Sequence, residues 1–133
     1  MQEIKEHCTT LRDKFLISLL YETGLRIGQV LGLHHEDILS WDNEIIVRYR
    51  NNNINKACSK SRDEQIVHVS HELMELYADY IVNECSNIQS DFVFVVLQAQ
   101  NRGQPYTYSA TQDLFNRLSK KIGAHITPHL FRH

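Results

Sequence analysis

The chain has 133 residues, a formal net charge of −2 and 42% hydrophobic residues, values typical of a soluble globular domain. This length predicts a single domain, residues 1–133, with one hydrophobic core. No uncharged apolar run approaches the ~20 residues that a membrane-spanning helix needs, so no membrane span is expected. Three widely spaced cysteines, Cys8, Cys58 and Cys85, exclude a disulfide framework and favour a cytoplasmic location.

The first third of the chain predicts two helices separated by a break. Leu11 to Thr23 has apolar residues at helical spacing, with Thr10 as the N-cap and Gly24 as the residue that ends the helix. A shorter helix is expected at Ile27 to Leu33, directly after Arg26.

Three strand-like runs follow these helices. They cover Ile38 to Trp41, Ile45 to Arg50 and Gln65 to Val69, and short polar residues suited to turns separate them. We expect them to form a small three-stranded antiparallel sheet.

The second half of the chain predicts more helix. Ser70 is expected to cap a helix of about 15 residues. Its apolar stripe consists of Leu73, Leu76, Tyr77, Tyr80 and Ile81. Ser109, with Gln112 three residues later, predicts the start of a helix that ends at Gly123.

Two further segments complete the prediction. Asp91 to Leu97 is rich in β-branched and aromatic residues but does not alternate, so it reads equally as a strand or as a buried extended segment. Thr127-Pro128 is an N-cap followed by proline, which predicts a helix beginning at His129. The fold class is therefore α+β, mostly helical with a small three-stranded antiparallel sheet.

The distribution of charge tells more than its total. Residues 1–44 hold eight acidic residues against four Lys and Arg, whereas no acidic residue follows Asp113. The basic residues of that last segment are Arg117, Lys120, Lys121 and Arg132. One end of the chain could therefore present a positive face to phosphates, with ordinary surface scatter as the alternative.

Four basic or imidazole side chains could act together on a phosphate. Arg26 lies in the break between two helices, and Lys60 precedes a strand in a polar hairpin. His129 and Arg132 are three residues apart near a predicted helix start, where free N–H groups favour an anion. Each residue alone would be ordinary, but together they would make a metal-free phosphate clamp.

The surroundings of these residues resemble a known family. Tyr21 to Leu33, followed by Asp37-Ile38, resembles the first arginine motif of the tyrosine recombinases, the phage-integrase family. Lys60 to Val69 resembles the lysine-bearing β-hairpin of that family. Thr127 to His133 resembles its His-x-x-Arg-His box. The spacing of these motifs and the helix after Ser70 resemble the transposon and integrative-element branch of the family more than the phage lambda type.

The resemblance implies a role for each site residue. Arg26 and Arg132 would clamp the scissile phosphate, His129 would hydrogen-bond it, and Lys60 would give a proton to the leaving 5′ oxygen, with Lys56 as an alternative lysine. The supporting residues would be His133 and Gln29, which stands where the family usually has a carboxylate. The family cuts and rejoins double-stranded DNA through a 3′-phosphotyrosine intermediate, as a tetramer on DNA and without metal or other cofactor.

The resemblance also implies that parts of the family's catalytic machinery are absent from these 133 residues. The nucleophilic tyrosine lies beyond the His-x-x-Arg box, and none of the chain's six tyrosines has that place. We therefore expect residues 1–133 to be a catalytic domain lacking its C-terminal part, without the N-terminal core-binding domain, and inactive alone.

Three other interpretations stay open at this point. The chain could be a natural cleavage-dead DNA-binding remnant or regulator, or a type IB topoisomerase, which uses related chemistry. It could also be a metalloprotein, with ligands drawn from His34, His35, Glu36 and Asp37 and from His129 and His133.

Overall fold

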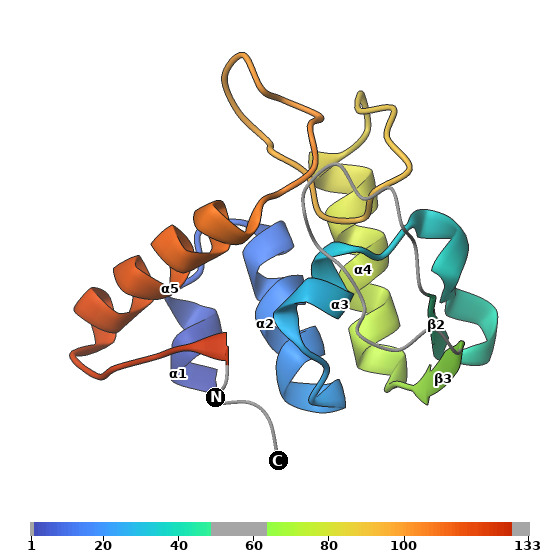
Figure 1. The fold of residues 1–133 in the computed structure, drawn as a ribbon, viewed down its shortest axis with the longest axis horizontal. Coiled ribbons are helices and arrows are strands. Elements are labelled where there is room, and N and C mark those ends of the chain that lie inside the picture. Colours follow the sequence, from blue (N-terminus) through green and yellow to red (C-terminus); the bar gives the residue numbers. More distant parts are fainter. Residues whose placement is uncertain (1, 49–63, 129–133) are drawn as a thin grey trace.

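The computed structural model describes residues 2–48 and 64–128. Its helices are α1 (Gln2–Glu6), α2 (Leu11–Thr23), α3 (Ile27–Leu31), α4 (His71–Glu84) and α5 (Tyr108–Ile122). Its strands are β1 (Ile38–Leu39), β2 (Glu44–Val47) and β3 (Gln65–His68), and 3-10 turns cover His35–Asp37 and Ser40–Asp42. The α+β prediction is confirmed, because the sheet lies beside a mostly helical body (Figure 1).

Helix α2 has the predicted bounds. The Thr10 side chain accepts a hydrogen bond from the Asp13 N–H at its start, and Gly24 ends it in a left-handed conformation with φ 68°. Helix α3 is shorter than predicted, since it ends at Leu31 rather than Leu33.

The sheet has the predicted topology, with order β1-β2-β3 and antiparallel pairs throughout. Strand β1 ends two residues earlier than expected, because Ser40–Asp42 forms a 3-10 turn and Asn43 takes φ 53°, a left-handed conformation that asparagine tolerates. Ile45 pairs with Ile38 on one side and Val67 on the other. The predicted end of the second strand, Tyr49 and Arg50, lies outside the described residues.

Helix α4 begins as predicted, because the Ser70 hydroxyl accepts from the Leu73 N–H at 3.1 Å. Helices α2 and α4 run antiparallel and are joined at both ends. The Glu84 carboxylate accepts from the backbone N–H groups of Leu11 and Arg12 at 2.9 and 2.8 Å. At the other end, the Glu22 carboxylate accepts from the Ser70 N–H and hydroxyl.

Two segments differ from the prediction. Thr107, not Ser109, caps α5, because its hydroxyl accepts from the Ala110 N–H at 3.1 Å and Ser109 already lies inside the helix. The helix does end at Gly123, with φ 78°. Helix α1 was not predicted, and the helix expected from His129 lies outside the described residues.

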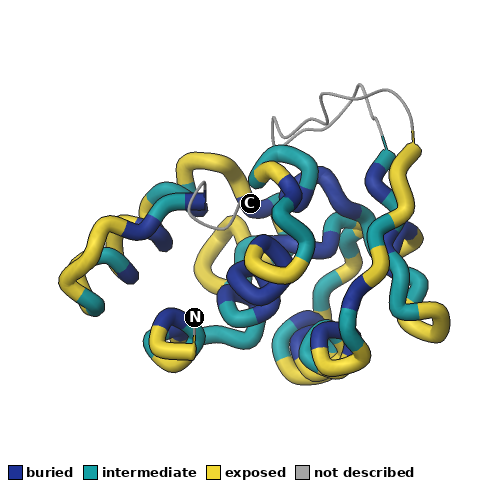
Figure 2. The backbone as a smooth tube through the Cα atoms, turned by 90° about the horizontal axis from the view of Figure 1, so that it is seen from below, coloured by how far each residue is buried: buried dark blue, intermediate teal, exposed yellow. Residues whose placement is uncertain are grey.

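The core lies between α2, α4 and the extended segment that follows α4. Phe15 is fully buried and packs on Phe94 and Tyr80, with ring centroids 5.4 and 6.2 Å away. Figure 2 shows the buried positions gathered inside the helical body. The segment Asp91 to Leu97 is extended, makes only isolated bridges and is buried at Val93 to Val95, so the second of its two predicted readings is the better one. No helix among the described residues is long and apolar enough to cross a membrane.

Candidate functional site

The turn between α2 and α3 positions Arg26. The Gly24 N–H donates to the Leu20 carbonyl at 2.9 Å, and the left-handed glycine redirects the chain away from the α2 axis. Leu25 then buries its side chain in the core with 7% of its surface exposed. Arg26 follows as the first residue of the α3 cap, with its side chain exposed. The turn thus holds a rigid backbone next to an accessible cation.

Gln29 fixes the backbone of this arginine. Its Oε1 accepts a hydrogen bond from the Arg26 N–H at 3.0 Å. The neutral amide thus caps the start of α3, as a carboxylate at this position could also do. The Arg26 guanidinium makes no hydrogen bond or ion pair with any residue in 2–48 or 64–128. An anion approaching Arg26 therefore displaces no internal partner within this part of the chain.

A buried carboxylate holds the base of the segment between β2 and β3. Asp37 is fully buried, and its Oδ1 accepts from the Arg48 Nε at 2.8 Å while its Oδ2 accepts from the His34 N–H at 3.0 Å. Arg48 in turn donates to Glu64 at 2.9 Å. Arg48 and Glu64 immediately flank residues 49–63, so this ion-pair chain ties both ends of that segment to the core. This ion-pair chain was not predicted, because its three residues are far apart in the sequence.

The Asp37 anchor predicts a stability loss on removal of its charge. Asp37→Asn should lower the free energy of unfolding by about 2 kcal/mol, because the amide leaves Arg48 without its buried partner. Urea unfolding followed by circular dichroism would measure this loss. Glu64→Gln is the matched control, since Glu64 is 62% exposed and such pairs contribute below about 1 kcal/mol. Equal midpoints for Asp37→Asn and the parent chain would contradict the anchor.

The remaining predicted site residues lie outside the described residues. These are Lys60, its alternative Lys56, His129, Arg132 and His133. Of the predicted site residues, only Arg26 and Gln29 lie among the described residues, and they contact each other. The approach to the last box is described as far as Pro128, and Ile126 is fixed to α5 by donating its N–H to the Ser119 hydroxyl at 2.8 Å.

Helix α5 offers a second basic surface. An open groove of about 600 Å³ lies between α5 and the start of α2, and Arg12, Tyr106, Asn116, Arg117 and Lys120 are among its lining residues. Arg12 is neutralised within the groove by Asp13, 2.9 Å away. Arg117 and Lys120 are exposed and pair with no described residue. Their charges are therefore available to an external anion.

The metal-site alternative gains no support from the described histidines. The His35 Nδ1 lies 2.7 Å from the Tyr77 hydroxyl, and burial lowers the pKa of His35. The ring of His34 packs edge-on against Phe92, and Asp37 holds Arg48. Within residues 2–48 and 64–128, no group of three or more His, Cys, Asp or Glu side chains could hold a metal ion.

The profile of the phage integrase family matches residues 1–133, the whole chain. The chain belongs to the phage integrase family. The recognition of this family from the Arg26 motif and the His129 box is thereby confirmed.

Relatives within the phage integrase family include proteins of mobile elements. Transposase A from transposon Tn554 of Staphylococcus aureus is 44% identical over 134 residues, covering 100% of this chain and 37% of the transposase. Tyrosine recombinase XerA of Saccharolobus solfataricus is 28% identical over 133 residues, which are 38% of that recombinase. The chain thus spans a little over a third of the length of these relatives.

Solved structures of the phage integrase family share the fold. The crystal structure of XerA recombinase superposes with a TM-score of 0.78 and 25% identity, covering 99% of this chain and 45% of XerA. The Tn1549 transposon integrase, solved in complex with a circular intermediate DNA, gives a TM-score of 0.71 at 24% identity, covering 90% of this chain and 43% of the integrase.

Three of the described tyrosines, Tyr77, Tyr80 and Tyr106, are buried or half-buried. The Tyr80 hydroxyl is buried and donates to the Val93 carbonyl at 2.7 Å. Burial raises the pKa of Tyr77 to about 12, so its phenolate is disfavoured. Tyr106 is also buried, and burial raises its pKa. The exposed Tyr21 and Tyr108 lie on α2 and α5, ahead of the His129 box.

Proposed function

We propose that this chain is part of the catalytic domain of a site-specific DNA recombinase, which cuts and rejoins DNA through a 3′-phosphotyrosine intermediate. The observation that carries the proposal is the exposed Arg26, whose guanidinium pairs with no described side chain and which is held by Gly24 and Gln29 in a chain that matches the phage integrase family over its whole length. The proposed domain is residues 1–133 without the family's C-terminal part. Transposase A of Tn554, 44% identical, supports a mobile-element role.

The proposed chemistry is two successive transesterifications. A tyrosine hydroxyl from outside this chain attacks the scissile phosphorus and loses its proton. A bond forms between the tyrosine oxygen and the phosphorus, which stays bonded to the 3′ oxygen, and the bond from the phosphorus to the 5′ oxygen breaks. The departing 5′ oxygen takes a proton, and rejoining by a 5′ hydroxyl reverses these steps. No metal or nucleotide enters the balance.

Some of the site residues would neutralise negative charge on the phosphate, and others would transfer protons or support the site. Arg26 and Arg132 neutralise the phosphate oxygens as charge builds in the transition state. Lys60 supplies the proton to the 5′ oxygen, and His129 hydrogen-bonds the phosphate. Gln29 and His133 act as supporting residues, of which Gln29 already holds the Arg26 backbone at 3.0 Å.

Double-stranded DNA is the proposed partner. Two observations support it: Arg117 and Lys120 are exposed and pair with no described residue, and the structurally similar Tn1549 integrase was solved with DNA. The complete protein would act in the cytoplasm as a tetramer on DNA, and this chain alone would bind DNA without cutting it. A DNA-binding remnant without a cleaving parent has no specific observation in its favour.

Salt dependence of DNA binding tests the proposal. The affinity of this chain for duplex DNA should fall as salt rises, and Arg117→Ala with Lys120→Ala should make the slope of log K against log salt shallower by about 2, because two phosphate contacts are lost. Arg26→Ala should also weaken binding. Titrations by fluorescence anisotropy at several salt concentrations give both quantities.

The control for this titration removes a cation elsewhere. Lys5 on α1 lines a separate cavity with Ser18 and Leu73, so Lys5→Ala should leave the slope unchanged. Binding that ignores salt, or parental binding by both Arg26→Ala and the α5 double variant, would overturn the proposed function.

A further inference from the structure

The loop before α5 presents a concentrated set of polar side chains. Residues 98–104, the Gln98–Gln104 loop, expose Gln98, Gln100, Asn101, Arg102 and Gln104. None of these side chains makes a hydrogen bond or ion pair with another described residue. The loop is the orange segment that extends away from the helices in Figure 1. Its donors and acceptors are therefore available to a partner.

The backbone of the loop is nevertheless well defined. The Val96 N–H donates to the Gln104 carbonyl and the Gly103 N–H donates to the Val96 carbonyl, both at 2.8 Å. Ala99 has φ 68°, a left-handed conformation that costs a non-glycine residue about 1–2 kcal/mol. Such strain persists only where the surroundings enforce it, and it gathers at functional positions.

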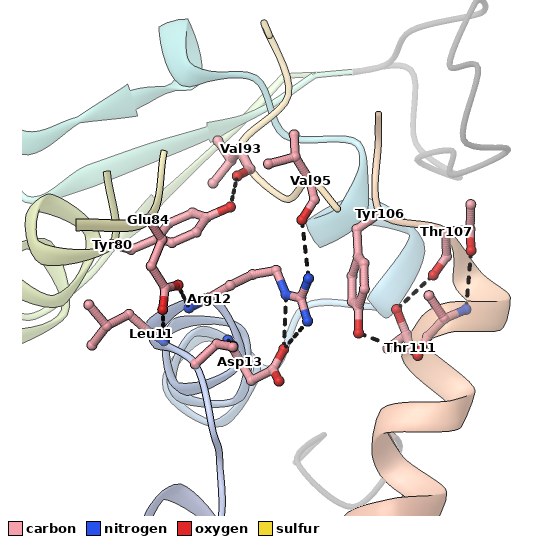
Figure 3. A network of polar contacts seen from close by, with 12 residues as sticks. Leu11, Arg12, Asp13, Tyr80, Glu84, Val93, Val95, Tyr106, Thr107 and Thr111 are labelled. Carbon is pink, nitrogen blue, oxygen red and sulfur yellow. Dashed lines mark hydrogen bonds and ion pairs between the residues drawn. The ribbon is translucent and has the colours of Figure 1, made fainter. Parts of the chain in front are cut away.

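The base of the loop is anchored in the core. The Tyr106 N–H donates to the Phe94 carbonyl at 2.9 Å, and both side chains are buried. The Arg12 guanidinium donates to the Val95 carbonyl at 3.2 Å and lies over the Tyr106 ring, 4.1 Å from its centroid (Figure 3). The exposed amides thus project from a fixed base, which reduces the entropy lost when they bind.

The composition of the loop matches the edges of bases better than the phosphate backbone. Gln and Asn pair with adenine, and Arg pairs with guanine, by two hydrogen bonds each. Between Asp91 and Asp113 no residue is acidic, and Arg102 is the only Lys or Arg. A phosphate-binding surface would need several cations, whereas one arginine among four amides suits base recognition.

We propose that the Gln98–Gln104 loop reads base edges in a groove of duplex DNA and so contributes to the choice of DNA sequence. This inference rests on the proposed function, because it requires that the chain bind duplex DNA. It assigns a different task to each surface: Arg117 and Lys120 supply affinity, and Asn101 and Arg102 supply discrimination.

Selection from a random duplex library tests the assignment. Parent chain is used to select its preferred sequence, and dissociation constants are then measured for that duplex and for a scrambled one. In the variant Asn101→Ala with Arg102→Lys, net charge is kept but both two-bond contacts are lost. The ratio of the two constants should fall about 10-fold, while binding to the scrambled duplex stays within about twofold.

The controls separate this inference from the proposed function. Gln2→Ala removes an exposed amide on α1 and should leave the ratio unchanged, as should Arg117→Ala with Lys120→Ala, which weakens both duplexes alike. An unchanged ratio in the loop variant, equal weakening on both duplexes, or a parent chain without sequence preference would overturn the inference alone. Failure of the parent chain to bind any duplex would overturn the proposed function and the inference with it.

Discussion

Arg26→Ala should slow DNA cleavage by the complete recombinase about 1000-fold while weakening DNA binding by only about 10-fold. The proposed function predicts this difference, because the guanidinium would contact one phosphate among many during binding but would neutralise the charge that develops in the transition state of cleavage. Its exposed position and lack of an internal partner in the described chain mean that the loss is not masked by a released ion pair.

The rate of covalent DNA–protein adduct formation on a nicked duplex measures the cleavage step. Arg117→Ala is the matched control, since it removes an exposed arginine from α5 and should lower affinity but leave the rate at saturating DNA unchanged. A parental cleavage rate in Arg26→Ala would remove Arg26 from the site, and equal losses of rate and affinity would make it a binding residue only.

Phe15→Ala should lower the free energy of unfolding by about 3–5 kcal/mol, a large share of the 5–15 kcal/mol typical of a domain. Phe15 has no exposed surface and stacks on Phe94, with its ring centroid also 5.4 Å from that of Tyr77. Truncation removes these contacts and leaves a cavity between α2, α4 and the extended segment.

Chemical unfolding at equilibrium would measure the effect of Phe15→Ala. Val82→Ala on α4 is the control, because Val82 is 70% exposed and its truncation should cost less than about 0.5 kcal/mol. A loss near 1 kcal/mol for Phe15→Ala would mean that the core repacks around the gap, and the aromatic stack would then not be the centre of the fold.

The elements predicted most accurately were those with local signals at both ends. Helix α2 has a hydroxyl cap at Thr10 and a glycine stop at Gly24, so both of its bounds were found. The start of α5 was misplaced because Thr107 and Ser109 are both plausible caps, and only the conformation of the chain after Pro105 decides between them. Helix α1 has few local signals and owes its stability to packing around Ile4.

In the candidate site, too, local contacts could be predicted from the sequence and contacts between distant residues could not. Arg26 and Gln29 could be found because their motif is contiguous, and their contact is local. The tie from Asp37 through Arg48 to Glu64 joins residues separated by up to 27 positions, and no spacing rule links them. The buried Arg12 was missed for the same reason, because its partners Val95 and Tyr106 are distant in sequence.

The hydrogen bonds of the Glu84 and Glu22 carboxylates join α2 and α4 at both ends and restrict how this domain can change shape. If one helix moved past the other by one turn, about 5.4 Å, the hydrogen bonds of Glu84 and Glu22 would both break. These contacts therefore favour movement of α2 and α4 as one rigid pair. A change in the shape of this domain that keeps these contacts would therefore move α2 and α4 together. Because Arg26 follows the end of α2 by only three residues, a movement of the α2–α4 pair would also change the position of Arg26.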